Sequence, residues 1–339
     1  MGKRLLNNLP EAGMGKDNYW VGFDLGGTKM MAVVYDSDFK EKGRERKKTK
    51  AQEGAKTGLE RIVGTIEEAL KAAGVDKDKI SGIGLGCPAP LNLKEGMITN
   101  APTLGWRDVP IKETLEKAFG CPAILANDVD AGVYGEYWLG AAKGSRCVVG
   151  VFPGTGIGGA CVYEGKLIQG KNTSCMEIGH LPMIPQGARC GCGQRGCLET
   201  VASRLAISAA AAAAAYRGEA PHLLDAGGTD LANMRSSALA DSIKAGDAAI
   251  EQIVRHAARW LGKGVAVAVN LLAPDVVILG GGLVEAMPGM YLEQVEDSAR
   301  SHCMSAYRKS FKIAKAELGD NATVTGAAAL VKEAAEGKN

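Results

Sequence analysis

The sequence predicts an α/β protein built from two similar halves. A strand-like segment that turns at glycines into a second strand occurs twice, with the turns DLGGTK at 24–29 and GTGIGG at 154–159, about 130 residues apart. Segments with helical apolar spacing follow both turns. At 339 residues, 46% apolar and 23% charged, the chain is long enough for two ordinary domains. This repetition suggests two similar halves that face each other across a cleft.

The first half begins with strand patterns over Tyr19–Asp24 and Thr28–Asp36, joined as a hairpin with glycines at its tip. The last helix of this half should have Asn127 or Asp128 near its N-terminus, since these side chains cap helices well. The other expected elements are a helix over Thr57–Ala73, a strand over Ile80–Cys87, a loop over Asn100–Trp106, a helix over Pro110–Phe119, a strand over Pro122–Ala126 and that last helix from about Val129 to Ala142.

The second half opens with strands over Arg146–Phe152 and Ala160–Tyr163 around the second glycine turn. A buried strand over Asp275–Leu279 then ends at three glycines, Gly280–Gly282. The other expected elements are helices over Ala202–Tyr216, Ala238–Ala245 and Ala248 to about Asn270, a further helix, a strand over Lys312–Ala316 and a last helix from Gly326.

Composition and charge exclude several classes of protein. A formal charge of +2 gives no reason to expect a nucleic-acid or membrane partner. The longest apolar run, Ser208–Ala215, is too short to span a bilayer. Nine cysteines without a recognisable signal peptide indicate a reducing, cytoplasmic location. Residues 1–17 read as a loosely packed N-terminal tail.

The stretch from Glu177 to Glu199 combines one histidine and three cysteines at short loop spacings. Such a set is typical of a closed, tetrahedral zinc site, which is structural because four protein ligands leave no open position. The alternative is a set of buried or reactive cysteines. In a zinc site, the two flanking glutamates would be held at fixed positions by the metal, which suits the binding of a polyhydroxylated ligand. The predicted ligands are His180, Cys190, Cys192 and Cys197.

The glycine turns predict phosphate binding. GTGIGG formally matches the dinucleotide fingerprint, but a strand follows it where that fingerprint requires a helix. Backbone amides of two hairpin loops can instead surround phosphates as nests, although Gly26 and Gly27 could also form a plain tight turn. Asp24 is placed to hold Mg²⁺ through water. Lys29 is either a phosphate contact or a solvated strand residue.

In their order and spacing, these motifs resemble the ROK family of sugar kinases and sugar-responsive repressors. The residues that carry the resemblance are DLGGTK, Asn127-Asp128, GTGIGG, EIGH at 177–180, CGCGQRGCLE at 190–199 and LGGG at 279–282. The resemblance implies two ribonuclease-H-like domains of the actin/hexokinase type, with ATP and sugar in the interdomain cleft. It also implies a small domain of residues 18–127 plus 326–339, and a large domain of residues 128–325 that contains the zinc knuckle.

The resemblance also implies a role for each site residue. Asp128 matches the general base that accepts the proton of the attacking sugar hydroxyl, although it could also be only a helix cap. The residues that it implies for sugar binding are Asn100, Asn127, Asp128, Glu177, His180 and Glu199. Nucleotide and Mg²⁺ binding falls to Asp24, Gly26, Gly27, Thr28, Lys29, Gly154, Thr155, Gly156, Gly281 and Gly282, with adenine near the last two.

By resemblance, the function is ATP- and Mg²⁺-dependent phosphorylation of a hexose in glycolytic carbohydrate metabolism, with glucose first. A homodimer is expected. The alternatives are a kinase for an N-acetylhexosamine or fructose, and a non-catalytic sugar-sensing ROK regulator. Such regulators usually carry an N-terminal helix-turn-helix domain, for which the roughly 18 residues before the first strand are too few. Three positions depart from the family pattern: Met176 stands where glycine is frequent, Cys87-Pro88-Ala89-Pro90 replaces a PGP-type stretch, and Ala160 stands where a third glycine is common in the second phosphate loop. Met176 adds bulk next to Glu177, so it bears on which sugar fits.

Overall fold

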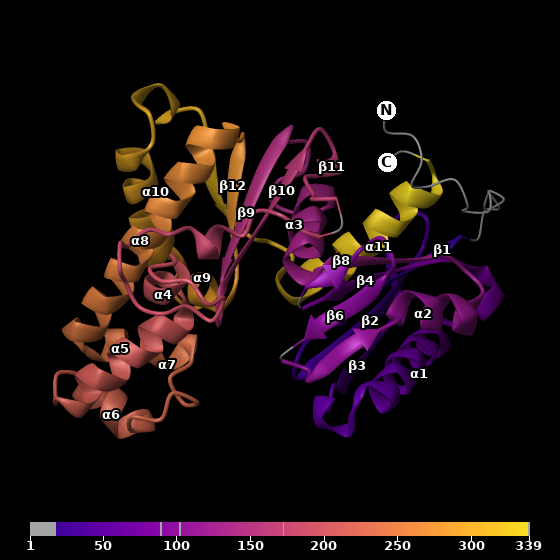
Figure 1. Ribbon diagram of the computed structural model, residues 1–339, viewed down its shortest axis with the longest axis horizontal. Helices are drawn as coiled ribbons and strands as arrows, with labels where there is room; N and C mark the ends of the chain where they lie inside the picture. Colours follow the sequence, from indigo (N-terminus) through magenta and orange to yellow (C-terminus); the bar gives the residue numbers. More distant parts are fainter. Residues whose placement is uncertain (1–17, 89, 102, 172, 338–339) are drawn as a thin grey trace. The chain divides into compact units, whose positions relative to one another are not determined.

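The structure is a computed structural model that describes residues 18–88, 90–101, 103–171 and 173–337 (Figure 1). The tail expected at residues 1–17 lies outside the described residues. The chain divides into two compact units. Unit 1 runs to Gly144 and also includes Gly165–Cys175 and the chain from Asp320, whereas unit 2 comprises Ser145–Glu164 and Met176–Gly319. Among the described helices, none has both the length and the apolar character needed to cross a membrane.

Unit 1 is built on a sheet with the strand order β3-β2-β1-β4-β8. Helices α1 and α2 lie on one side of it and α3 and α11 on the other (Figure 1). A smaller sheet has the order β5-β6-β7. The elements are β1 (Tyr19–Leu25), β2 (Lys29–Tyr35), β3 (Glu41–Lys48), α1 (Ala55–Ala73), β4 (Ile80–Cys87), β5 (Leu91–Asn92), β6 (Met97–Ala101), β7 (Trp106–Val109), α2 (Ile111–Phe119), β8 (Ala123–Asn127), α3 (Asp128–Trp138), β11 (Lys166–Leu167) and α11 (Ala322–Ala335).

The hairpin that opens unit 1 is the one predicted from its glycines. β1 and β2 pair antiparallel from Trp20–Tyr35 to Leu25–Met30, and Gly26 closes the turn by donating its N–H to the carbonyl of Lys29 at 2.9 Å. Both strands are buried on both faces, as a nearly continuous apolar sequence requires. This burial fixes the direction in which the phosphate-loop residues leave the sheet.

Helix α11 packs so closely against the sheet that only glycine fits at the contact positions of β1 and β4. A Cβ atom on Gly84 of β4 would lie 1.7 Å from the carbonyl oxygen of Ala327, and one on Gly22 of β1 would lie 1.8 Å from that of Val324. The backbones of strand and helix are therefore in direct contact. This close packing fixes α11 over β1, which carries Asp24 near its carboxyl end, and over β4, which lies between β1 and β8.

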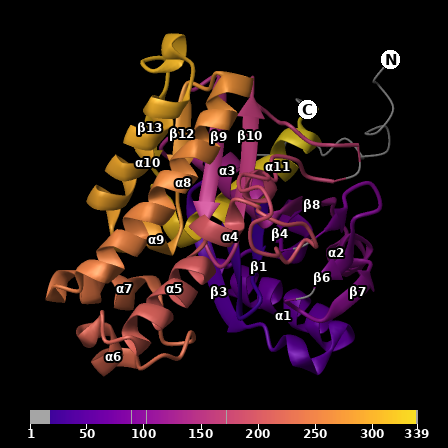
Figure 2. The same ribbon diagram turned by 60° about the vertical axis from the view of Figure 1, so that its left-hand side comes forward.

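Unit 2 contains strands in the order β10-β9-β12-β13 with a large helical part beside them. Figure 2 shows α8 and α10 side by side next to β12 and β13. The elements are β9 (Cys147–Pro153), β10 (Ile157–Tyr163), α4 (Glu199–Ala202), α5 (Arg204–Tyr216), α6 (Pro221–Gly227), α7 (Ser236–Ala245), α8 (Ala248–Leu272), β12 (Val276–Leu279), α9 (Gly282–Ala286), α10 (Pro288–His302) and β13 (Lys312–Lys315).

The same strand arrangement occurs in both units. In unit 1 the hairpin β1–β2 is antiparallel, and β4 and β8 follow β1 in parallel. In unit 2 the hairpin β9–β10 is antiparallel, and β12 and β13 follow β9 in parallel. Each unit has its own apolar core. The predicted α/β fold with a repeated glycine-tipped hairpin is therefore confirmed.

Several predicted elements were wrong in extent or kind. The loop expected over Asn100–Trp106 is shorter than predicted, because Asn100 and Ala101 belong to β6 and Trp106 to β7, and Asn100 pairs with Arg107 in that ladder. The helix expected from Val129 to Ala142 ends at Trp138, and the last helix starts at Ala322 instead of Gly326. As a division into folding domains, the expected boundaries stay a prediction. In the structure α3 packs against α11, so unit 1 continues past Asn127 to Gly144.

Candidate active site

The carboxyl ends of three parallel strands bring the acidic candidates of unit 1 together. In the ladder, Asp24 of β1 is level with Gly86 of β4, and Gly86 is level with Ala126 of β8. Cys87, the next residue of β4, is level with Asn127. Asp24 and the Asn127-Asp128 pair therefore leave the same edge of the sheet, with β4 between them. In open α/β sheets this edge is where ligands bind.

The carboxyl group of Asp24 is in an unfavourable place for a negative charge. Burial, then the charges of Asp128 and Asp320, raise its pKa to about 7, while Arg46 lowers it. Arg46 itself pairs with Asp320 at 2.7 Å, and no cation of the described residues forms an ion pair with Asp24. Carboxylate oxygens are the donors that Mg²⁺ prefers, and the Asp24 carboxylate has that of Asp128 nearby. The residues at this edge therefore fit the predicted magnesium role of Asp24.

Asn127 and Asp128 form the start of helix α3. The carboxamide oxygen of Asn127 accepts the N–H of Val129 at 2.9 Å and that of Asp130 at 3.4 Å, so the predicted capping role is confirmed. A carboxylate oxygen of Asp128 also accepts the N–H of Val129 at 2.9 Å. The cap occupies the oxygen of Asn127, but its amide nitrogen can still donate to a ligand. Asn100, in β6, is exposed.

The first glycine loop is anchored by a residue that sequence reasoning missed. The buried hydroxyl of Thr49 donates to the carbonyl of Gly26 at 2.6 Å, and its N–H donates to the carbonyl of Thr28 at 2.9 Å. Among the described residues, the amides of Gly27 and Thr28 have no partner, so both are available to an anion. Lys29 is exposed and forms no ion pair with a described residue, which leaves both of its predicted roles open.

Unit 2 repeats this arrangement with its own glycines. β9 and β12 run parallel, with Val151 level with Leu279, so the loops that follow them lie at one edge. Gly281 adopts φ +91°, and a Cβ there would lie 3.2 Å from the carbonyl of Pro153. Within the loop after β9, the N–H of Gly154 donates to the carbonyl of Gly156 at 2.8 Å. The structure thus brings together Gly154, Thr155, Gly156, Gly281 and Gly282.

A cavity of about 760 Å³ opens beside these glycines in unit 2. Its wall includes Gly282 and, next to it, Ser236 at the start of α7, whose hydroxyl would lie 3.1 Å from a Cβ at Gly282. Its charged side chains are Arg204, Arg235 and Glu285, none of which sequence reasoning singled out. Arg204 is the first residue of α5, and the sequence predicts only that a helix runs through it. A cavity of this size can hold a nucleoside.

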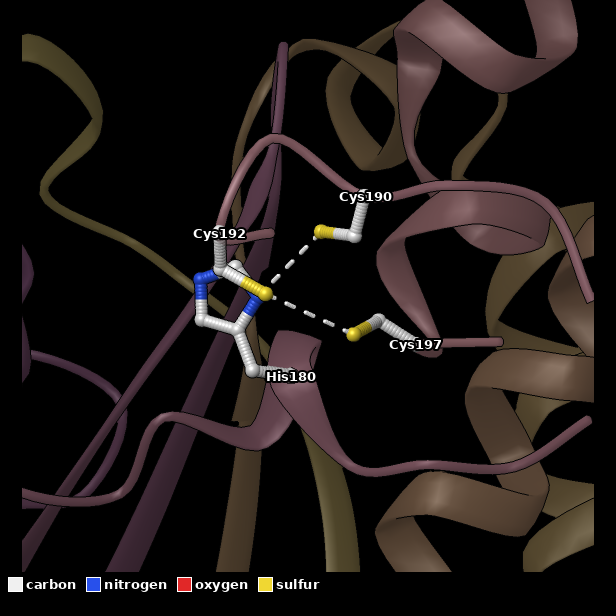
Figure 3. Close-up of side chains that lie close together, drawn as sticks. All are labelled: His180, Cys190, Cys192 and Cys197. Atoms are coloured by element: carbon white, nitrogen blue, oxygen red, sulfur yellow. Dashed lines mark hydrogen bonds between the residues drawn. The ribbon is translucent and has the colours of Figure 1, made fainter. Parts of the chain in front are cut away.

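The four predicted metal ligands form one cluster in unit 2 (Figure 3). Their ligand atoms all lie within 4.8 Å of one another. Nδ1 of His180 is 3.6 Å from Sγ of Cys190, and Sγ of Cys192 is 3.7 Å from Sγ of Cys197. Ligand atoms about 2.0–2.3 Å from a tetrahedral Zn²⁺ are separated from each other by about 3.5–3.8 Å. The spacing and the donor set therefore fit zinc.

Local backbone geometry explains why this sequence can form the cluster. The amide of Cys190 donates to the carbonyl of Gln194 at 2.8 Å, and Gly193, at φ +94°, donates back to Cys190 at 3.0 Å. This tight loop presents Cys190 and Cys192 to the same point. Without metal, burial raises the pKa of Cys190 and of Cys197, whereas the amide of Gln194 lowers the pKa of Cys192.

Glu199 connects the cluster of His180 and the three cysteines with the second glycine loop. One carboxylate oxygen accepts the N–H of Ile157 at 2.9 Å, and the other lies 3.6 Å from Sγ of Cys190. A Cβ on Gly156 would lie 2.2 Å from the first of these oxygens, so glycine is needed for this approach. Glu177 is exposed, immediately before the 3₁₀ turn Ile178–His180.

Met176 has a backbone conformation that favours glycine. Its φ is +60°, in the left-handed region, where a side chain is disfavoured. Its side chain packs against the core of unit 2 and, with Leu271 of α8, lines a small apolar cavity of about 160 Å³. Packing of the side chain against this core offsets part of the cost of the conformation.

Comparisons with known proteins agree with this arrangement. The family model described as ROK family matches residues 20–334. The chain belongs to the ROK family. A curated glucokinase of Halalkalibacterium halodurans is 32% identical over 321 residues, which cover 94% of this chain and 96% of that protein.

A solved structure of a ROK family glucokinase from Streptomyces griseus, in complex with glucose and AMPPNP, is similar with a TM-score of 0.79. It is 29% identical and covers 93% of this chain and 99% of its own. A putative xylose repressor of a Caldicellulosiruptor species is 30% identical over 276 residues, which cover 80% of this chain and 68% of that protein. The likenesses to the two glucokinases show that this ROK protein is a glucokinase-like sugar kinase.

Proposed function

We propose that this ROK kinase transfers the γ-phosphoryl group of ATP to a hydroxyl group of a hexose, and that glucose becomes glucose 6-phosphate. The observation that carries the proposal is the shared sheet edge in unit 1, where Asp24 and the Asn127-Asp128 pair leave parallel strands together. The similar Streptomyces griseus enzyme, whose structure contains glucose and AMPPNP, supports the choice of sugar and donor.

In this proposal Asp128 is the general base. Its carboxylate accepts the proton of the sugar hydroxyl while the hydroxyl oxygen bonds to the γ-phosphorus and the bond to the ADP oxygen breaks. A positioned base of this kind contributes about 10²- to 10⁴-fold to the rate. The carboxylate is held by its own hydrogen bond to the Val129 amide at the start of a helix, which preorganises it.

The phosphates would be bound mainly by backbone amides. In unit 1 the free amides are those of Gly27 and Thr28, with Lys29 as an additional cation, and Gly26 shapes the turn. In unit 2 the amides of Thr155 and Gly156 likewise have no partner among the described residues, and Gly281 and Gly282 border the cavity for the nucleoside. When bound near Asp24, Mg²⁺ would neutralise charge on the β- and γ-phosphates.

The side chains proposed to bind the sugar are Asn100, Asn127, Asp128, Glu177, His180 and Glu199. Amides both donate and accept, and carboxylates accept, so this set matches the hydroxyl groups of a hexose. His180 faces the cluster through Nδ1, which leaves Nε2 for the sugar. Zinc held by His180 and the three cysteines would fix these side chains and take no part in the chemistry.

A coupled assay with Asp128→Asn tests the catalytic assignment. We expect kcat with ATP, Mg²⁺ and glucose to fall at least 100-fold, with glucose affinity within about twofold of wild type, since the carboxamide cannot accept the proton. Asp38→Asn, an exposed control in the same unit, should retain full activity. A normal kcat in Asp128→Asn would contradict the assignment.

The same assay across a panel of sugars tests substrate choice. Glucose should have the highest kcat/KM, and a higher value for fructose or an N-acetylhexosamine would replace glucose as the substrate.

Because a putative xylose repressor is also similar, a sugar-responsive regulator is the second candidate. Sequence-specific gel shifts together with no phosphorylation of any sugar in the panel would favour that candidate. Homodimer formation, cytoplasmic location and a role in glycolysis stay predictions.

A further inference from the structure

We propose that Arg204 binds the phosphates of the nucleotide and holds the second phosphate loop in its binding conformation. This inference rests on the proposed ATP-dependent function. It assigns to unit 2 a phosphate-binding cation, which the loop GTGIGG at 154–159 lacks, at a position outside the motifs that carry the family resemblance.

Arg204 contacts the loop through both its main chain and its side chain. Its N–H donates to the carbonyl of Gly154 at 2.9 Å, and Nη2 of its guanidinium donates to Oγ1 of Thr155 at 2.8 Å. Arg204 begins helix α5, and the hydroxyl of Ser203 caps that helix by accepting the N–H of Ala206 at 3.2 Å. The guanidinium is therefore held beside the loop by a capped, 13-residue helix.

The guanidinium has unused hydrogen-bonding capacity. It carries five N–H donors, and among the described residues the bond to Thr155 is the one that its side chain makes. No carboxylate in the described part of the chain forms an ion pair with Arg204, whereas seven of the other thirteen described arginines have such a partner. The side chain also lines the 760 Å³ cavity beside Gly282.

These contacts select an anionic ligand. A neutral hydroxyl such as that of Thr155 does not require a cation, whereas a phosphate accepts paired bonds from the planar guanidinium. Within the described part of the chain, the amides of Thr155 and Gly156 on the same loop have no partner, so amides and guanidinium can bind one polyphosphate from adjacent positions. The charged side chains on the wall of the cavity are Arg204, Arg235 and Glu285, so positive charge is in excess there.

The test compares two ligands of the full-length protein by calorimetry. AMPPNP with Mg²⁺ carries the phosphates, and adenosine does not. For Arg204→Ala we expect the affinity for AMPPNP to fall about 10- to 100-fold, as for loss of a charge-assisted hydrogen bond, with adenosine affinity within about twofold of wild type. Arg204→Lys should recover part of the loss, because it keeps the charge without the fork. Arg217→Ala, at the other end of α5, is the matched control and should leave both affinities unchanged.

A double-mutant cycle with Thr155→Val separates binding from positioning. If Arg204 both binds phosphate and holds Thr155, the two losses will be less than additive, and Arg204→Ala will still weaken AMPPNP binding in the valine background. Equal losses for adenosine and AMPPNP, or no loss for AMPPNP, would overturn the inference while the kinase assignment stands. Wild-type protein that fails to bind AMPPNP would instead overturn the ATP donor itself, and the inference with it.

Discussion

Asp24 shows how one buried carboxyl group links pH to stability. Because its pKa is raised from 3.8 to about 7, the folded protein binds this proton more tightly than the unfolded chain does. Its favourable contribution to the free energy of unfolding is therefore fully present below about pH 4 and is lost as the pH rises to about 7. Above that pH, the folded protein holds a charge that burial and Asp128 both disfavour.

We predict that Asp24→Asn is more stable than wild type at pH 8 in the absence of Mg²⁺, by a few kcal/mol at most, since each pKa unit corresponds to about 1.4 kcal/mol. At pH 4.5 the two proteins should be nearly equal. Urea unfolding at both pH values, with Asp38→Asn for the same change in net charge, measures the difference. A gap of the same size at both pH values would mean that titration of Asp24 is not its source.

At the scale of elements, the contact between α11 and β4 depends on the absence of side chains. Gly84 meets the backbone of Ala327, and this contact fixes the edge from which Asp24 and Asn127 emerge. Neither backbone can move without separating the helix from the sheet. The contact joins residues that are far apart in the sequence, so it can form only when the C-terminal helix docks.

We predict that Gly84→Ala loses about 3 kcal/mol or more of stability, because its Cβ would overlap the Ala327 carbonyl. Gly64→Ala in α1 is the control: nothing lies within 4 Å of its Cβ, so the better helix former should stabilise the protein by up to about 1 kcal/mol. Thermal unfolding, with soluble yield for any variant that does not fold, compares them. Equal stability of Gly84→Ala and wild type would show that α11 adjusts easily.

For the whole molecule, removal of zinc should affect both stability and ligand binding. We predict one zinc per chain by metal analysis, its loss in Cys192→Ser, and its retention in Cys175→Ser, which changes a thiol outside the cluster. Loss of zinc should lower the melting temperature and weaken glucose binding, because structural zinc contributes folding free energy directly. Full activity with clearly less than one zinc per chain would contradict this structural role.

The parts predicted from sequence share one property, which is that their signal is local. The ligands from His180 to Cys197 lie within one loop region, and Asn127 caps the helix that it directly precedes. The glycine-tipped hairpins likewise join neighbouring strands. Local spacing and turn chemistry are sufficient for such features.

The parts that were missed depend on distant partners or lack an apolar pattern. β3 has the sequence EKGRERKK and lies at the edge of its sheet, where alternation of charged residues gives no strand signal. β6 was not recognised because it is short and is stabilised by β7. The contacts of Arg204 with Thr155 and of Thr49 with Gly26 join separate segments, and no spacing rule predicts where a side chain will point.

The position of Glu199, between Cys190 and the Ile157 amide, has a thermodynamic consequence. A thiolate bound to zinc has no proton to donate. Metal binding therefore removes the hydrogen bond from Cys190 to one oxygen of Glu199, while the other oxygen still accepts the Ile157 amide. If metal content thereby changes nucleotide affinity by some factor, nucleotide must change zinc affinity by the same factor, because coupling between sites is reciprocal. Zinc retention during dialysis, measured with and without AMPPNP, would then report on nucleotide binding, although the nucleotide site contains no zinc ligand.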